Sequence, residues 1–176
     1  SGRSLPHVMM MLVPEAWDGN EQMDPIKKAF YEYHATLMEP WDGPAALTFT
    51  DGKLIGALLD RNGLRPLRYV ITKDGRAIAA SEAGVLQLDP ANVLRKGRLQ
   101  PGKMLLIDTE KGKIITDEEI KKQIASRQPY GTWLENYKIR LEDLAEPRLA
   151  FASLSPNAVF RYQQVFGYSR EDIETI

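Results

Sequence analysis

The N-terminal part of the chain contains two segments with the apolar spacing of helices. Ser4-Leu5-Pro6 is typical of a helix start, because Ser caps the first turn and Pro fits it without losing a hydrogen bond. The nearly continuous apolar run that follows predicts a buried helix ending before Pro14. Asp24 and Pro25 predict a second helix whose apolar positions share one face: Ile26, Ala29, Phe30, Tyr33 and Leu37.

The middle of the chain shows short apolar runs separated by turn residues. Asp51-Gly52 predicts a two-residue hairpin loop, and Lys73-Asp74-Gly75 and Thr109–Gly112 predict two further hairpins. The six predicted strands are 45–50, 53–60, 68–72, 76–81, 104–108 and 113–116. Because short turns join neighbouring strands, we expect an antiparallel sheet. The basic stretch Arg95–Arg98 is interpreted as a solvated loop.

Helical signals return after the predicted sheet. Thr116 followed by Glu119 is a capping box, which predicts a helix to about Ser126. A short helix is expected over 133–137, and the poorly patterned stretch Leu144–Leu154 is interpreted as a linker. Two more helices begin at 155 and 169, and the second is cut by the chain end, so we expect the natural polypeptide to continue.

Composition narrows the class of protein. The 176 residues are 43% hydrophobic and 27% charged, as in a globular domain. Lys and Arg number 23 against 24 Asp and Glu, so the net charge of −1 argues against a dedicated nucleic-acid partner. No apolar run reaches the roughly 18 residues that a membrane span needs, so we expect no membrane partner.

The chain contains no cysteine, which excludes disulfides, thiolate metal sites, iron–sulfur ligation and a cysteine nucleophile within it. His7 and His34 are too few for a zinc site without several carboxylates, and each is interpreted as a structural histidine. No phosphate-binding glycine loop or dinucleotide fingerprint is present. The residues alone therefore predict an α+β domain with no assembled catalytic or metal site.

One segment, Arg61–Arg68, places three arginines between two predicted strands. Guanidinium groups suit carboxylate or phosphate, so the segment is a candidate anion site. It is also a candidate rigid corner, in which Gly63 and Pro66 set the backbone and the arginines pair with Asp60 or Glu82. An oxyanion role for Asn62 is outweighed by the frequency of Asn-Gly in turns.

Several longer blocks resemble the large subunit of glutamate synthase. They are Met38–Ala45, Asp60–Tyr69, Ala80–Val85 and Lys96–Gly102, together with Ser4–His7, Pro14–Trp17 and Arg161–Tyr168. The blocks occur in the same order along nearly the whole chain. The resemblance implies the N-terminal-nucleophile hydrolase fold of a class II amidotransferase, with antiparallel sheets between helices, here incomplete and followed by a helical tail.

The resemblance also implies a function for the whole enzyme, which makes two glutamates from glutamine and 2-oxoglutarate. An N-terminal cysteine hydrolyses glutamine, and ammonia passes to a domain with FMN and an iron–sulfur cluster. Electrons come from an NADPH-linked small subunit or ferredoxin, in the cytoplasm or the plastid stroma of a plant. This chain lacks the cysteine, so we expect it to be inactive alone and to bind no cofactor itself.

The expected organisation is a later part of the glutaminase domain over residues 1–143 and the start of the central domain over 144–176. No catalytic residue of the family can be placed on this chain. Arg61, Asn62, Arg65 and Glu82 are expected to form a structural corner near the glutamine pocket. Two alternatives remain open: a non-enzymatic module that binds an anion or a partner, and a fragment of another class II amidotransferase.

Overall fold

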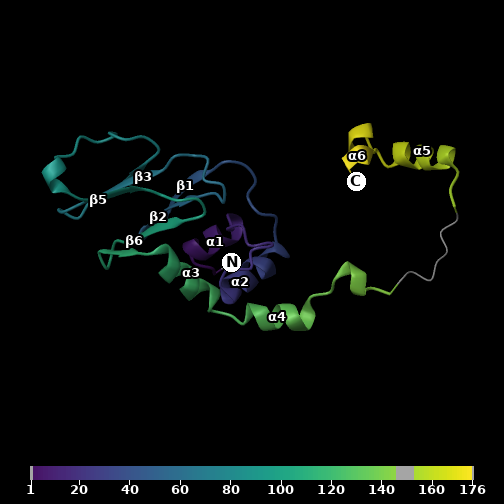
Figure 1. Ribbon diagram of the computed structural model, residues 1–176, viewed down its shortest axis with the longest axis horizontal. Coiled ribbons are helices and arrows are strands. Elements are labelled where there is room, and N and C mark those ends of the chain that lie inside the picture. The colour runs from purple at the N-terminus through teal and green to yellow at the C-terminus, as the bar shows by residue number, and fades with distance from the viewer. Residues whose placement is uncertain (1, 146–152, 176) are drawn as a thin grey trace. The chain divides into compact units, whose positions relative to one another are not determined.

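The computed structural model describes residues 2–145 and 153–175 (Figure 1). The chain divides into two compact units, and the boundary between them along the sequence falls between Lys138 and Ile139. The first unit holds both sheets and four α-helices. Within the described residues, no helix is long and apolar enough to cross a membrane.

Two helices open the first unit where the sequence predicts them. Helix α1 spans Leu5–Leu12, and helix α2 spans Pro25–Ala35 with the Asp24 side chain accepting a hydrogen bond from the first turn. The predicted apolar face of α2 is correct in part, because Phe30 is buried and Ala29 and Tyr33 pack against the core. Ile26 and Leu37 are about half exposed, whereas Phe30, Tyr31 and His34 are buried. Tyr and His contribute to the face that α2 presents to its neighbours, which apolar spacing alone did not reveal.

Four strands form one antiparallel sheet in the order β1-β2-β6-β7. Their bounds are Ala46–Thr50, Leu54–Leu59, Met104–Asp108 and Lys113–Ile115. The register places the first hairpin loop on Gly52 and Lys53, one position later than predicted, because Thr50 pairs with Ile55. Only Gly52 of these turn residues has a positive φ, and the Asp51 carboxylate accepts hydrogen bonds from the amides of Lys53 and Leu54.

Three strands form a second antiparallel sheet in the order β4-β3-β5. They span Ala77–Ala80, Arg68–Thr72 and Val93–Arg98, and a short 3-10 helix, η1, covers Pro90–Asn92. The interpretation of Arg95–Arg98 as a solvated loop is wrong, since these residues pair with β3 throughout. The strand is basic because it lies at an edge of its sheet, where one backbone side and most side chains face solvent.

The main core lies between the four-stranded sheet and the helices. Leu58, Met104 and Leu106 point from the sheet into this core, where Met10 and Phe30 meet them. Figure 1 shows α1, α2 and α3 gathered beside β2 and β6. Gly56 lies under the Phe49 ring, and a Cβ there would stand 2.1 Å from a ring carbon, so only glycine fits.

Helices α3 (Asp117–Ala125) and α4 (Tyr130–Tyr137) complete the helical layer. The Thr116 hydroxyl caps α3 by accepting from the Glu119 amide at 3.2 Å, as the capping box predicts. Helix α4 begins three residues earlier than expected, and Trp133 on it packs against the core. Trp41, by contrast, is 43% exposed.

The opposite face of the four-stranded sheet carries apolar side chains that the helices do not cover. Ile55, Ile107 and Ile114 lie side by side on three adjacent strands, because the register pairs Ile107 with both of the others. Ile55 is 48% and Ile114 is 37% exposed. We call this row of three isoleucines the open sheet face.

The second unit contains a 3-10 helix, η2 (Leu141–Asp143), and two α-helices, α5 (Pro156–Val165) and α6 (Arg170–Thr175). Ser155 caps α5, and Gly167 with a φ of +75° follows its end, as the sequence predicts. Most of the predicted linker Leu144–Leu154 lies outside the described residues.

Candidate functional site

The predicted corner at residues 60–66 is organised by a buried aspartate. Oδ1 of Asp60 accepts a hydrogen bond from the amide of Ala45 at 3.1 Å, and Oδ2 accepts from those of Asn62 at 2.9 Å and Gly63 at 3.2 Å. Gly63 has a φ of +60°, and a Cβ there would stand 2.6 Å from Pro101. The expected glycine-dependent turn is therefore present, and one carboxylate accepts hydrogen bonds from two backbone amides of the turn and from that of Ala45.

The arginines of the corner do not hold it together. The ion pairs among the described residues include none from Arg61, Arg65 or Arg68, so the expected pairing with Asp60 or Glu82 is wrong. The backbone amides around Asp60 occupy its oxygens instead.

The four predicted corner residues do not converge on one site. Arg61, Asn62, Arg65 and Glu82 are all exposed. Arg61 lines a cavity of about 350 Å³ together with Glu15 and Tyr31, whereas Glu82 lines a different cavity. The nearness of this corner to a glutamine pocket stays a prediction.

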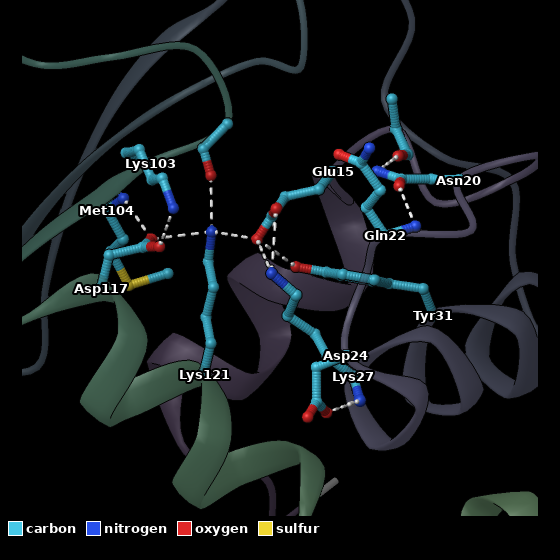
Figure 2. Close-up of polar contacts among 12 residues, drawn as sticks. Glu15, Asn20, Gln22, Asp24, Lys27, Tyr31, Lys103, Met104, Asp117 and Lys121 are labelled. Carbon is cyan, nitrogen blue, oxygen red and sulfur yellow. Dashed lines mark hydrogen bonds and ion pairs between the residues drawn. The ribbon is translucent and has the colours of Figure 1, made fainter.

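The structure instead gathers charged side chains around Lys121, where Figure 2 shows contacts from three parts of the chain. Nζ of Lys121 lies 2.7 Å from Oε1 of Glu15 and 2.7 Å from Oδ1 of Asp117, and it donates to the carbonyl oxygen of Gly102 at 2.5 Å. The Lys121 side chain is 3% exposed. We call this group the Lys121 network.

Outer partners complete the hydrogen bonding of both carboxylates. Nζ of Lys27 lies 3.1 Å from Oε2 of Glu15, and the Tyr31 hydroxyl donates to Oε1 at 3.3 Å (Figure 2). On the other side, Nζ of Lys103 lies 2.9 Å from Oδ2 of Asp117. The amide of Met104 donates to Oδ1 of Asp117 at 2.8 Å.

The surroundings of Glu15 and Tyr31 fix the protonation of these two side chains near neutral pH. Burial raises the pKa of Glu15, but Lys121 and Lys27 outweigh this effect and bring that pKa below its ordinary value. Burial, with Glu15 and Asp117 nearby, raises the pKa of Tyr31 well above its ordinary value. Glu15 is therefore ionised and Tyr31 neutral, which suits a structural clamp better than a general acid or base.

A second buried polar pair joins α1 to α2. Nε2 of His7 lies 3.2 Å from Nε2 of His34, and Nδ1 of His34 donates to the carbonyl oxygen of Phe30 at 2.7 Å. Since that nitrogen carries the proton, Nε2 of neutral His34 accepts from His7. Burial, then His34, lowers the pKa of His7 to about 4. No group of three or more metal-ligating side chains occurs among the described residues.

Sequence reasoning missed the Lys121 network. The capping box marks the helix start beside Asp117 but does not reveal that its carboxylate binds Lys103 and Lys121. One local signal was available, since Lys121 follows Asp117 by four residues on α3 and lies next to Ile120 on the buried side. Glu15 lies 106 residues away from Lys121 and gives no such signal.

Comparisons with known proteins identify the family. The family model described as glutamine amidotransferases class-II matches residues 1–133. The chain is 53% identical to the glutamate synthase [NADPH] large chain of Bacillus subtilis (strain 168), over 99% of this chain and 11% of that protein. It is 46% identical to the ferredoxin-dependent glutamate synthase of Pyropia yezoensis, over 100% of this chain and 11% of that protein.

A third relative is the glutamate synthase [NADH] of Schizosaccharomyces pombe, which is 43% identical over 98% of this chain and 9% of its own length. The chain thus spans about a tenth of the length of the curated relatives it matches. Its α+β fold, with antiparallel sheets flanked by helices, agrees with the match. The family model covers more than half of the residues, and the chain therefore belongs to the class II glutamine amidotransferases, in a form homologous to glutamate synthases.

Proposed function

We propose that this chain is a scaffold segment of the glutamine-hydrolysing domain of a glutamate synthase and is inactive by itself. The whole protein would convert L-glutamine and 2-oxoglutarate into two L-glutamates with a reductant. Support comes from the family match over residues 1–133 and from relatives whose names specify NADPH, NADH or ferredoxin.

The observation that carries the scaffold role is the open sheet face. The four-stranded sheet has a helical layer on one side, while Ile55, Ile107 and Ile114 form a part-exposed apolar row on the other. A contiguous apolar row of this kind favours coverage by a further element, beyond β4, with which Ile55 and Ile107 share a cavity. The chemistry fits the same role, since the chain has no cysteine nucleophile and the Lys121 network has fixed charges.

The domain organisation is part of the proposal. Residues 1–143 would belong to the glutaminase domain, and residues 144–176 would begin the central domain. The end of the family match at residue 133 and the start of a second compact unit at Ile139 support a change of domain in this region.

The proposal places the cofactors and redox partners elsewhere in the whole protein. FMN and an iron–sulfur cluster would belong to later domains, because this chain offers no thiolate for a cluster. The remainder of the same polypeptide would be the main partner, with an NADPH-linked small subunit or ferredoxin as electron donor. The protein would act in the cytoplasm, or in the plastid stroma of a plant.

Two substitutions, made in the full-length protein that the gene encodes, test the scaffold role. Ile55→Asp puts a charge into the open sheet face, and we expect at least a tenfold loss of glutamine hydrolysis or of soluble protein. Ile26→Asp is the matched control, because Ile26 is 52% exposed at the start of α2, and we expect less than a twofold loss. Equal tolerance of both substitutions would show that nothing covers the face.

The size of the native polypeptide separates this proposal from the free-standing module. An antibody against this segment should capture a chain several times larger than 19.9 kDa, as judged by intact mass. That protein should hydrolyse glutamine, whereas the isolated 176-residue chain should not. A native polypeptide of about 19.9 kDa would overturn the proposal.

A further inference from the structure

A second cavity, of about 440 Å³, lies on one face of the three-stranded sheet and beneath the loop that leads from β4 toward β5. Three separate segments of the chain line this cavity. Arg68 comes from the block around the corner, Glu82 from the loop, and Arg98 from β5. The proposed scaffold role makes no use of this cavity.

The strand register concentrates positive charge in this cavity. Arg68 pairs directly with Arg98, and Val70 pairs with Lys96, so alternation along the strands puts all three cations on the same face. Like charges at directly opposed positions destabilise a sheet. Glu82 is the one carboxylate that lines the cavity.

Among the described residues, none of these three cations forms an ion pair, although the Glu82 carboxylate lines the same cavity. The ion pairs of that part of the chain involve neither Arg68, Lys96 nor Arg98. Arg95 differs from them, because its neighbouring position on β5 turns it to the other face, where it lies over the Tyr69 ring at 5.6 Å. Paired guanidinium groups facing one cavity are suited to a bidentate carboxylate or phosphate.

The remaining walls of the cavity are apolar. Val70 and Ile78 form part of its floor, and the loop contributes Val85 and Leu86. These two loop side chains are 55% and 53% exposed, so apolar surface borders the cationic cluster. A ligand that fits both surfaces has an anionic group at one end and an apolar body at the other.

We propose that this cavity binds a small organic anion, with its carboxylate or phosphate between Arg68 and Arg98 and its apolar body against Val85 and Leu86. The anion relieves the repulsion between the opposed arginines. Lys96 adds a third, more distant positive charge on the same side of the sheet. This proposal does not depend on the scaffold role, so its failure would leave the scaffold proposal intact.

Calorimetric titration of the gene-encoded protein with phenyl phosphate tests the site, because this probe joins a phosphate to an apolar ring. We expect saturable binding that weakens about tenfold in Arg68→Ala and in Arg98→Ala, as for the loss of a charge-assisted hydrogen bond. Arg95→Ala is the matched control on the other face of β5 and should bind like the parent protein. Phenol, which lacks the charge, should not bind at this site.

Arg98→Lys provides a second readout that does not depend on the alanine variants folding. It keeps the charge but loses the planar fork, so we expect binding between that of the parent and that of Arg98→Ala. Added phenyl phosphate should also raise the unfolding temperature of the parent more than that of Arg98→Lys. Absence of binding would overturn the proposal, and is the result expected if an acidic segment of the same protein fills the cavity. Equal binding by Arg98→Lys and Arg98→Ala would also overturn it.

Discussion

Lys121 lies almost fully buried between two carboxylates that come from different parts of the chain. It joins Glu15, which follows α1, to Asp117 at the start of α3, and it also reaches the Gly102 carbonyl beside the sheet. If the buried ammonium group is removed, the carboxylates of Glu15 and Asp117 lose a partner in a position that water solvates poorly. The side chain therefore acts as a clamp between the helical layer and the sheet.

We predict that Lys121→Ala lowers the local stability of α3 by about 3 kcal/mol, at the low end for a broken buried ion pair, because Lys27 and Lys103 still neutralise the two carboxylates. Hydrogen exchange of the α3 amides in the gene-encoded protein measures this loss. Lys53→Ala is the control, since its pair with Glu110 is well exposed and worth about 0–1 kcal/mol. Equal losses in both variants would refute the clamp.

The His7–His34 pair predicts a dependence of stability on pH. Burial lowers the pKa of both rings, and Arg3 and Arg127 beside His7 act in the same direction. Between pH 6.5 and about 4 the unfolded chain therefore binds protons that the folded His7 does not. Stability is present above pH 6.5 and is lost progressively as the pH falls toward 4.

We expect the exchange protection of α1 and α2 to decrease from pH 7 to pH 5, after correction for the intrinsic pH dependence of exchange. This range lies above the ordinary pKa of 4.5 for glutamate, so the carboxylates contribute little. A His7→Gln, His34→Gln double variant should lose most of this decrease. A slope that persists in the variant would assign the pH dependence to other groups.

Among the elements, helices α2 and α3 are each fixed at the start by a single side chain. Oγ1 of Thr116 accepts from the Glu119 amide, and Oδ1 of Asp24 accepts from the Lys27 amide. Ser4 also precedes a helix, but its side chain makes no capping hydrogen bond. Similar residue types in the same position therefore differ in what they contribute.

We predict that Thr116→Ala lowers the stability of α3 by about 1 kcal/mol, the usual cost of a lost N-cap. Ser4→Ala should change α1 by no more than a few tenths of that amount, because no capping bond is lost. Exchange protection of the first-turn amides in each helix measures both effects. Similar losses at the two helices would contradict this difference.

The strands show that a local sequence pattern predicts some strands and turns but not how all strands pair. All three predicted hairpins are present, yet β5 was missed, because its Arg and Lys side chains suit an edge strand and resemble a solvated loop in sequence. The hairpins are also divided between two sheets, with β6 joining β2 across 44 intervening residues while β3 and β4 pair elsewhere. Alternation predicts that a segment is extended but not which strand it pairs with.

For the whole molecule, the open sheet face is the main consequence of the fold. Ile55, Ile107 and Ile114 are ordinary strand residues in sequence, and only the register sets them in one row. Because of this row, we expect the isolated chain to be poorly soluble. This part-exposed row is the structural basis of the proposed scaffold role.

The sequence by itself determined most helix starts, the presence of the three hairpins and the resemblance to the family, because caps and turns depend on residues three or four positions apart and the motif blocks are long. It also excluded a cysteine nucleophile. Only the tertiary structure decided the Lys121 network, the full buried face of α2, the two-sheet division and the opposed pair Arg68 and Arg98. These features depend on contacts between distant segments, whose free energy is realised only when the chain has closed around its core.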